Sequence, residues 1–311
     1  MFTVALEQKN INREALKHIG GKALPLFELR VYKIPVPKGF AITTKAYGLF
    51  LEANGITNDI KKLSQVKSHP AIQKKVAKIR NSILNGNIPK EMEFELHDRL
   101  AQYGLKHYVV RSSANVEDAG TKSWAGAFES YLNIPQKDVL SAVKQCWASV
   151  FNDRVIHYIN NIKRLASIKM AVIVQEYIDS DISGVCFTRN PLDSKDNNIL
   201  IEAVFGLGEL LVQGEIIPDK YKVERESNII LEADVQEQNR ATKAAKNSGT
   251  KLVSMQKSLK QKLSGRQIIE LANIAQKIER IHGKGCDIEW CRKDDVFYIV
   301  QSRPITTNRK R

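Results

Sequence analysis

The sequence predicts a two-lobed α+β protein in which stretches of helix and stretches of strand occupy separate parts of the chain. Residues 56–104 and 135–165 carry apolar side chains at helical spacing. Residues 170–178 and 184–191 are short apolar runs rich in β-branched side chains, which favours buried strands. At 311 residues the chain is long enough to bury a substantial core and to divide into two lobes.

The composition is that of an ordinary soluble globular protein, with 43% hydrophobic and 26% charged residues. No apolar run approaches the length that spans a bilayer, and the start, MFTVALEQKN, lacks the features of a signal peptide. We therefore expect a cytoplasmic protein without a membrane partner. The cysteines form no CxxC pair and are expected to be reduced structural thiols rather than zinc ligands. They are Cys146, Cys186, Cys286 and Cys291.

The formal net charge of +14 raises the question of nucleic-acid binding. The lysines are spread along the chain, however, and the only compact basic run is residues 308–311. Interleaved aromatic residues are not evident. A solvated basic surface that also attracts a polyanionic nucleotide is the simpler interpretation, and nucleic acid is not an expected partner.

We expect the first long helix to start directly after the segment HIGGK, residues 18–22. Its two glycines allow a tight turn, and Pro25 falls in the first helical turn, where a missing N–H costs little. Lys22 then stands at the helix N-terminus, where the macrodipole favours anions. A loop with a solvated lysine would explain the same residues. The side chains expected to face the core are Leu24, Leu26 and Phe27.

An extended, proline-fixed segment at residues 34–37 precedes a predicted strand at residues 40–42. Thr43 or Thr44 is a natural N-cap for the next helix, which Gly55 ends. The helical blocks that follow are expected to be structural, with Trp147 in the core rather than serving as a platform for a ligand. Their core rows are Ile72, Val76, Ile79 and Ile83 in the first block, and Val139, Val143, Trp147 and Phe151 in the second.

The stretch from Arg111 to Asn133, RSSANVEDAGTKSWAGAFESYLN, is the part around which we expect the rest to be organised. A β-branched run delivers the chain to Arg111, a loop rich in small residues follows, and a strand resumes at residues 131–134. Such a loop suits the approach of backbone N–H groups to phosphate, and arginine supplies a matching donor fork. An exposed hairpin loop with an incidental arginine is the alternative.

A short polar link at residues 179–183 separates two predicted strands, and we place the lobe boundary there, with lobes at 1–180 and 181–311. Gln175 would then lie at a hinge where an adenine can bond to backbone edges. A strand end with a solvated glutamine fits equally well.

The second half is predicted to contain a strand and a glycine turn at 199–209 and further strands at 221–224 and 229–232. Residues 235–265 are polar and lysine-rich, and we expect a mobile surface loop there. A helix is predicted over residues 267–282, ended by Gly283.

Two β-rich runs joined by a charged turn predict a hairpin near the C-terminus. A three-residue turn at 294–296 places Glu289 opposite Gln301 and Asp287 opposite Arg303, whereas a two-residue turn would separate these pairs onto different faces. A carboxylate beside an amide oxygen offers hard ligands for Mg²⁺ held against phosphate. An exposed hairpin with a Glu–Gln contact and an Asp–Arg ion pair accounts for the same residues.

Five sequence blocks occur in an order that resembles one known family. They are GGK, PVP-x-GF-x-x-TT-x-AY, RSSA-x-x-ED with WAGAFES-YLN, GLGE with VQG and PD-x-Y, and DIEW with Q-x-RP. From Lys22 to Pro304, this pattern resembles the ATP-binding domain of the pyruvate phosphate dikinase and phosphoenolpyruvate synthase family, which rifamycin phosphotransferase shares. The resemblance implies an ATP-grasp fold: two lobes with mixed or antiparallel sheets, flanking helices, and a nucleotide in the cleft between them.

The resemblance also implies roles for individual residues. Lys22, Arg111 and Arg303 would bind ATP phosphates and act in catalysis, and Gln175 would lie near the base. Gly126 and Ser130 would belong to the loop that covers the phosphates, although the family often has threonine where Ser130 stands. Glu289 and Gln301 would hold Mg²⁺.

By this resemblance the chain is an ATP-dependent phosphotransferase module that passes a phosphoryl group to a histidine on a carrier domain. No GG-x-x-SH-x-A segment supplies that histidine here, so we expect the carrier on a separate chain or a missing region. GGKALPLFEL and AGAFES depart from the family's usual residues after the lysine and after AG. An ATP-binding regulatory protein or ATPase without a carrier, and a basic nucleic-acid-binding protein, are the alternatives.

Overall fold

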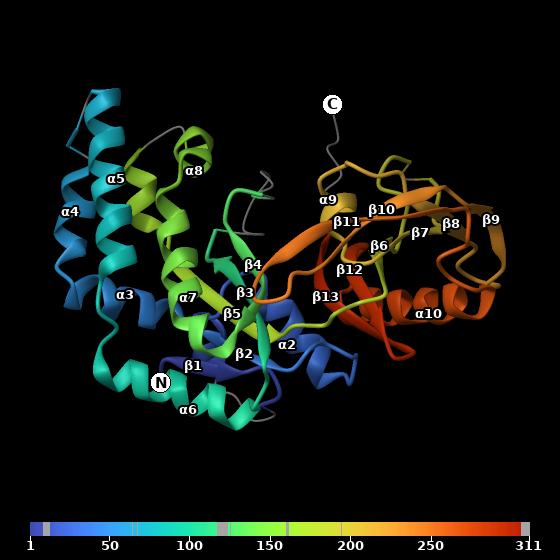
Figure 1. Ribbon diagram of the computed structural model, residues 1–311, viewed down its shortest axis with the longest axis horizontal. Coiled ribbons are helices and arrows are strands. Elements are labelled where there is room, and N and C mark those ends of the chain that lie inside the picture. The colour runs from blue at the N-terminus through green and yellow to red at the C-terminus, as the bar shows by residue number, and fades with distance from the viewer. Residues whose placement is uncertain are drawn as a thin grey trace. The chain divides into compact units, whose positions relative to one another are not determined.

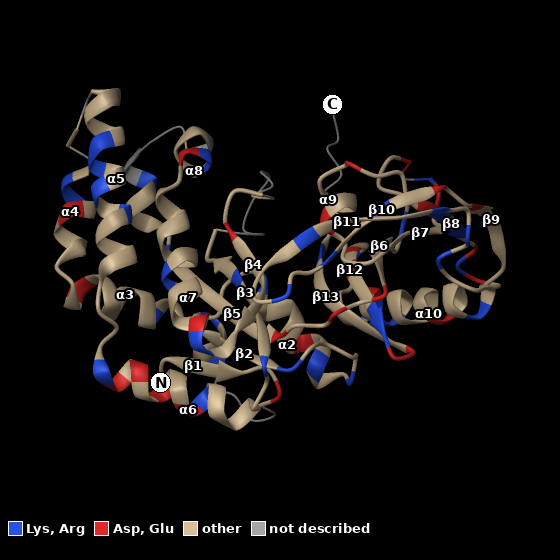
Figure 2. Cartoon of the chain, viewed as in Figure 1, with Lys and Arg blue, Asp and Glu red and all other residues tan. Residues whose placement is uncertain are grey.

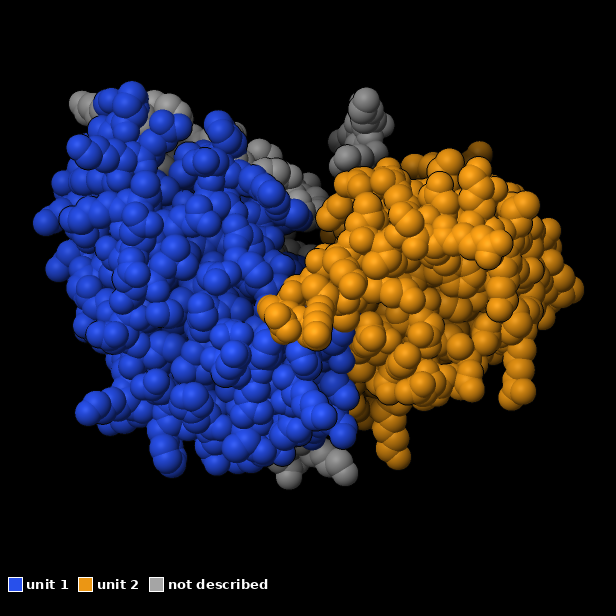
Figure 3. Space-filling model, in the orientation of Figure 1, with its two compact units in different colours: residues 1–24, 38–177 blue, residues 25–37, 178–311 orange. Residues whose placement is uncertain are grey.

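The computed structural model describes residues 1–8, 13–63, 65–66, 68–116, 124, 126–159, 162–193 and 195–305 and shows the predicted α+β class. The chain forms two compact units, coloured separately in Figure 3. Unit 1 comprises residues 1–24 and 38–177, and unit 2 comprises residues 25–37 and 178–311. Residues 25–37 and 178–180, which were expected in the first lobe, belong to unit 2.

In the described part of unit 1, five strands form an antiparallel sheet in the order β1-β2-β5-β3-β4 (Figure 1). β2 is buried along its whole length and β5 as far as Gln175, so these apolar strands are covered on both faces. The strands are β1 (Thr3–Ala5), β2 (Gly39–Ile42), β3 (His107–Ala114), β4 (Ser130–Pro135) and β5 (Met170–Glu176).

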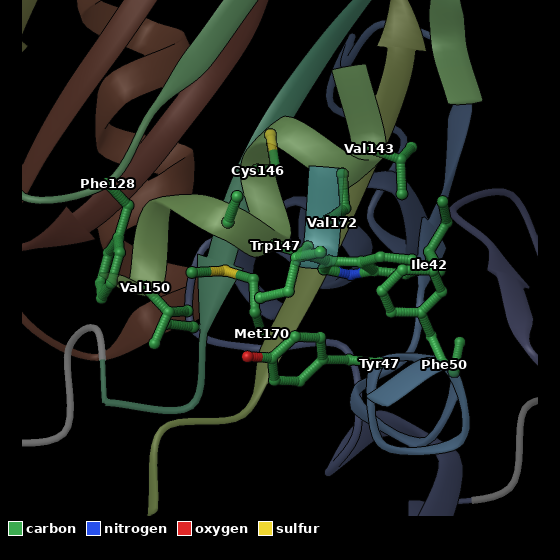
Figure 4. Packing of buried hydrophobic residues seen from close by; sticks show 14 of the residues in the cluster. Ile42, Tyr47, Phe50, Phe128, Val143, Cys146, Trp147, Val150, Met170 and Val172 are labelled. Carbon is green, nitrogen blue, oxygen red and sulfur yellow. The ribbon is translucent and has the colours of Figure 1, made fainter. Parts of the chain in front are cut away.

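Helices cover one face of this sheet and enclose the main core of unit 1 (Figure 1). Trp147 is fully buried, with ring centroids 4.7 Å from Phe50 and 6.0 Å from Tyr47 (Figure 4). The predicted core role of Trp147 is confirmed. The helices are α1 (Arg13–Leu16), α3 (Thr44–Ala53), α4 (Ile56–Leu63), α5 (His69–Asn85), α6 (Lys90–Tyr103), α7 (Val139–Ala148) and α8 (Asp153–Tyr158), with 3-10 turns η1 (Gln136–Asp138), η2 (Ser149–Phe151) and η3 (Ile162–Ser167).

Local sequence signals account for the ends of these helices. Thr43 caps α3 by accepting a bond from the backbone N–H of Ala46 at 3.3 Å, as predicted. α6 ends at Gly104, whose φ of 59° suits a residue without a Cβ. The helix after the GGK segment is α2 (Ala23–Val31). Leu26 and Phe27 are buried as expected, whereas Leu24 is half-buried.

In the described part of unit 2, six antiparallel strands follow the order β13-β12-β6-β7-β8-β9. The long helix α10 (Gly265–His282) packs against β7, β8, β9 and β12. A capping box between Ser264 and Gln267 starts α10, and Gly283 ends it in the left-handed conformation. The other elements are β6 (Ile182–Phe187), β7 (Ile199–Phe205), α9 (Glu209–Val212), β8 (Asp219–Val223), β9 (Ile230–Asp234), β12 (Cys286–Lys293) and β13 (Val296–Pro304).

The prediction of a surface loop at residues 235–265 is wrong for most of that range. β10 (Gln238–Ala244) and β11 (Thr250–Ser258) pair there as an antiparallel hairpin. Most side chains of β11 remain exposed or half-exposed. β11 therefore lacks the alternation of apolar and polar residues that is typical of a strand with one buried face.

A fully buried ion pair lies in unit 2. Lys262 Nζ is 2.7 Å from Asp219 Oδ1, and both side chains are at most 1% exposed. The same carboxylate accepts bonds from the Tyr221 hydroxyl and from the backbone N–H groups of Gln236 and Lys262. A buried charge is tolerated when it is paired and hydrogen-bonded in this way.

The basic surplus of the chain is visible on α4 and α5 (Figure 2). Lys61, Lys62, Lys74, Lys78 and Arg80 are exposed on these two helices. No exposed aromatic residue is interleaved with them on either helix among the described residues, which agrees with a solvated basic surface.

All four cysteines are buried and free, as predicted. Burial raises the pKa of the Cys291 thiol to about 12, which keeps this thiol protonated and unreactive. Among the described residues, no helix is both long and apolar enough to cross a membrane.

Candidate functional site

The GGK turn lies directly against the end of β3. A Cβ on Gly20 would stand 1.9 Å from the carbonyl oxygen of Ser113, so the close approach requires glycine, as does its φ of 80°. The backbone N–H of Gly21 donates to the carbonyl oxygen of Ala114 at 3.2 Å. The turn thus fixes the backbone of Lys22 beside the strand that carries Arg111.

The hydroxyl of Ser113 holds the start of α2. It accepts bonds from the backbone N–H groups of Lys22 at 3.2 Å and Ala23 at 3.1 Å, and it donates to the carbonyl oxygen of Ile19 at 2.9 Å. Ser113 is fully buried. Sequence reasoning did not single out this residue, although the second serine of RSSA was the available signal.

The ammonium group of Lys22 points toward the strand next to Arg111. Lys22 Nζ donates to the carbonyl oxygen of Ser112 at 3.3 Å, and it lies 3.5 Å from the Ser112 hydroxyl. Two cationic residues are therefore held at neighbouring places on β3, Arg111 within the strand and Lys22 at the next residue, Ser112. Such a pair is suited to a polyanionic ligand.

Strand register brings three further predicted residues to one face of the unit 1 sheet. Arg111 pairs with Ser130 on β4 and with Ile173 on β5, and Gln175 stands two residues beyond Ile173. Because side chains alternate along a strand, Arg111, Ser130 and Gln175 share the face opposite the helix-covered core. Gln175 is 2% exposed, which does not match the solvated strand end considered as the alternative.

Gly126 lies between the predicted phosphate loop and β4. Its φ is 71°, and its carbonyl oxygen accepts a bond from Arg154 Nη1 at 3.2 Å. The central part of the predicted loop, residues 117–123 and 125, lies outside the described residues. Gly126 therefore marks the described end of that loop.

The C-terminal hairpin has the predicted pairing but not the predicted turn. β12 and β13 place Glu289 opposite Gln301 and Asp287 opposite Arg303. The turn contains two residues, Asp294 and Asp295, both with positive φ, rather than three. A bulge between Glu289 and Trp290 restores the register, because two residues of β13 oppose one of β12 there.

Polar contacts connect both facing pairs of the hairpin. Gln301 Nε2 donates to Glu289 Oε1 at 2.9 Å, and Arg303 binds Asp287 Oδ2 through Nε at 2.9 Å and Nη2 at 2.7 Å. Arg303 thus neutralises Asp287, and the Gln301 amide lies beside Glu289.

A carboxylate beside an amide is a donor set that fits a hard cation which also binds phosphate oxygens. For Gln301 to ligate such an ion, its amide must turn the oxygen rather than the nitrogen toward it. No group of three or more His, Cys, Asp or Glu side chains in the described ranges could hold a metal by itself. The pair Glu289 and Gln301 is therefore suited to a cation that arrives with an anionic ligand.

Glu202 on β7 extends the acidic character of this sheet face. Val185 on β6 pairs with Glu289 on one side and with Glu202 on the other. Burial raises the pKa of Glu202, Lys220 lowers it, and the negative charge of Asp287 raises it again. Sequence reasoning missed Glu202, although its place in the strand ILIEAVF was a period-two signal.

Each unit thus assembles its own part of the predicted residue set. Unit 1 brings Arg111, Ser130 and Gln175 to one sheet face, with Lys22 bonded to the neighbouring Ser112 and Gly126 at the loop end. Unit 2 joins Glu289, Gln301 and Arg303 on one hairpin.

Similarity to known proteins extends over almost the entire chain. The chain is 37% identical to rifampicin phosphotransferase from Bacillus subtilis over 316 residues, which cover 99% of this chain and 36% of the relative. It is 35% identical to a probable phosphoenolpyruvate synthase from Archaeoglobus fulgidus, covering 97% and 41%, and 35% identical to one from Methanothermobacter thermautotrophicus, covering 93% and 44%. The chain therefore spans well under half the length of these relatives.

The match to a family as a whole is equally broad. Residues 16–311 match the family described as pyruvate phosphate dikinase, AMP/ATP-binding domain. The range includes all of unit 2, unit 1 from residue 16 onward, and every residue of the predicted site. The chain belongs to the family of pyruvate phosphate dikinase AMP/ATP-binding domains.

Proposed function

We propose that this chain is an ATP-grasp module that binds MgATP and transfers a phosphoryl group to a histidine of a carrier domain. The observation that carries the proposal is the bond from Lys22 Nζ to the carbonyl oxygen of Ser112, the residue next to Arg111 on β3, on a chain that belongs to an ATP-binding family. Two fixed cations favour the phosphates of ATP over its uncharged portions. The proposed place of action is the cytoplasm.

In unit 1, Lys22 and Arg111 bind phosphate oxygens, and the segment around Gly126 and Ser130 supplies backbone N–H donors. Gln175 lies on the same sheet face as Arg111 and contacts the base region of the nucleotide. Phosphoryl transfer requires mainly positioning and stabilisation of spreading negative charge, and fixed cations provide both.

In unit 2, Glu289 and Gln301 hold Mg²⁺, and Arg303 binds the transferring phosphates. The bound cation would neutralise phosphate charge during transfer. Arg303 is held by Asp287 at 2.7 Å, which orients its guanidinium group before a nucleotide arrives.

The relatives support a transfer reaction, because they are named as a phosphotransferase and as probable phosphoenolpyruvate synthases. The proposed first acceptor is a histidine of a carrier domain in trans or in a region missing from this sequence. The carrier would then deliver the phosphoryl group to a final acceptor.

The test combines nucleotide binding with transfer. MgATP should raise the melting temperature of the chain, whereas DNA or RNA should not. Arg111→Ala and Glu289→Ala should each weaken MgATP binding about ten- to a hundredfold, as expected from about 1.5–3 kcal/mol for a bond to a charged group. Both should abolish labelling of a carrier histidine while leaving the circular dichroism spectrum unchanged.

Lys78→Ala is the matched control, because Lys78 is an exposed cation on α5 that pairs only loosely with Asp59 at 3.7 Å. It should bind MgATP like the wild type. Unchanged labelling in both site variants would refute the proposed site. Phosphate release without histidine labelling in the wild type would favour the ATPase alternative, and analysis of AMP against ADP would define the product.

A further inference from the structure

The segment Gly126–Phe128, which joins the proposed phosphate loop to β4, is fastened through its backbone carbonyl groups. Asn152 Nδ2 donates to the carbonyl oxygen of Ala127 at 3.0 Å, and Arg154 Nη1 donates to that of Gly126 at 3.2 Å. Asn152 is 9% exposed and Ala127 is 3% exposed, so water is largely excluded from the first bond. Arg154 is exposed, and its bond competes with water.

The other end of the Asn152 amide is fixed as well. Its Oδ1 accepts a bond from the backbone N–H of Val155 at 2.8 Å and so caps α8. Because the oxygen must face this N–H, the nitrogen must face the carbonyl group of Ala127. One buried side chain therefore connects the start of α8 to the described end of the loop.

The segment Gly126–Phe128 is connected to β3, the strand that carries Arg111. Phe128 is 7% exposed, and its ring stacks on Trp124 with centroids 5.6 Å apart. The next residue, Glu129, accepts a bond from the backbone N–H of Ser112 at 3.2 Å, and Ser130 then pairs with Arg111. A shift at Ala127 would consequently displace both Gly126 and the neighbours of Arg111.

We propose that Asn152 is a positioning residue for the phosphates of ATP. It acts through the carbonyl group of Ala127, which positions Gly126 on one side and, on the other, Ser130, the residue that pairs with Arg111. The inference rests on the proposed function, and it assigns a role to a residue outside the phosphate-binding set. Without the amide donor, the buried carbonyl group loses its partner and the segment must reorganise before it can meet a phosphate.

Asn152→Asp isolates this role, because the carboxylate still caps α8 but cannot donate to Ala127. Asn152→Ser is the uncharged counterpart, since serine is also a good N-cap and is too short to replace the amide. The matched control is Asn54→Asp. Asn54 Nδ2 donates to the carbonyl oxygens of Phe50 at 2.8 Å and Asn87 at 3.0 Å, and its Oδ1 accepts from the N–H of Asn87 at 2.9 Å, so the chemistry is the same away from the loop.

Binding of MgATP and of adenosine is measured by titration calorimetry for the wild type and the three variants. Both Asn152 variants should bind MgATP about three- to tenfold more weakly, as expected for the loss of one buried neutral hydrogen bond. Adenosine affinity should stay unchanged, because adenosine has no phosphates. Hydrogen exchange should be faster over residues 124–130 in these variants, and Asn54→Asp should resemble the wild type in all three measurements.

Wild-type MgATP affinity in both Asn152 variants would overturn the inference while leaving the proposed function intact. An equal loss for adenosine, or an equal loss in Asn54→Asp, would also overturn it, because the effect would then be general destabilisation. A wild-type chain that does not bind MgATP would refute the proposed function, and this inference with it. Asn152→Ser carries the test if Asn152→Asp does not fold.

Discussion

Replacing Gly20 by alanine should disrupt the GGK turn more severely than an ordinary turn substitution. The left-handed backbone at φ 80° costs an L-residue about 1–2 kcal/mol. The added Cβ would also stand 1.9 Å from the carbonyl oxygen of Ser113 and 2.5 Å from its hydroxyl oxygen. Relieving such overpacking typically costs about 1–3 kcal/mol more, so we expect a total of about 2–5 kcal/mol.

Gly55→Ala separates the two contributions. Gly55 has a φ of 68°, and no heavy atom of the described chain within 4 Å of a Cβ built there, so only the backbone cost applies. Both glycines belong to unit 1. Gly20→Ala should therefore unfold at a lower urea concentration, with an additional loss of about 1–3 kcal/mol, or about 2–12 °C in melting temperature.

The two variants should differ in ligand binding as well. A displaced turn moves the backbone of Lys22 away from Ser113, so Gly20→Ala should lose MgATP affinity, whereas Gly55→Ala should keep it. Equal unfolding free energies for the two variants would refute the close approach of the turn to β3. Wild-type nucleotide affinity in Gly20→Ala would refute its role in placing Lys22.

Three further outcomes are expected from unit 2. Lys262→Met should destabilise the protein by about 3–5 kcal/mol in urea unfolding, because it leaves the buried Asp219 carboxylate without its cation. The double variant with Asp219→Asn should lose less unfolding free energy than the sum of the two single variants. Strict additivity of the two losses would contradict the ion pair. Burial raises the pKa of Glu279, but bonds with Thr188, Arg225 and Arg189 outweigh it and leave the pKa lowered. The stabilisation by Glu279 is therefore present above the unfolded pKa of about 4.3 and is lost as pH falls through the lower folded pKa. In Glu279→Gln the free energy of unfolding should depend less on pH in this acidic range. An unaltered pH dependence would exclude this contribution. Glu289→Gln should raise the Mg²⁺ concentration needed for half-maximal ATP-induced stabilisation about tenfold or more, which a magnesium titration at fixed ATP measures; an unchanged requirement would exclude Glu289 as a ligand.

Elements with a strong apolar period could be predicted from the sequence. Val76, Ile79 and Ile83 are at most 3% exposed, and Trp147 is fully buried. These residues repeat every three or four positions, so one helical face is apolar whatever packs on it. Such local periodicity is sufficient to fix both the helix and the side that it buries.

The hairpin shows where local reasoning reaches the right pairs by a wrong route. Asp294 and Asp295 adopt positive φ of 47° and 63°, a conformation for which asparagine or glycine is the usual signal. Val300 is the additional residue of the bulge, since Gln301 pairs with Glu289 and Ile299 pairs with Trp290. Valine is an ordinary strand residue, so the sequence gives no sign of the bulge. The pairing of Glu289 with Gln301 is correct because the bulge offsets the missing turn residue.

The hairpin β10–β11 was missed because it has little apolar character to detect. Leu252 is 57% exposed, and no side chain of β11 is fully buried. A strand with one buried face alternates apolar and polar residues, whereas a strand exposed on both faces reads as a loop.

The anchors of the site could not be predicted, because they join positions far apart in the chain. Ser113 bonds the backbone of Ala23, which is 90 residues away, and Asn152 bonds Ala127, which is 25 residues away. A serine or an asparagine is common in loops and caps, so its residue type alone does not reveal a distant carbonyl or N–H partner. Only the folded arrangement identifies these bonds.

The Ser113 hydroxyl has a mechanical consequence. It bonds the main chain at Lys22 to the strand of Arg111, so the backbones of these two residues are held in a fixed relation. Their spacing at the backbone is then set before any anion arrives. Only the two side chains then remain adjustable, because both lysine and arginine have flexible aliphatic stems. Tolerance for differently placed anions must therefore come from those stems and not from the backbone.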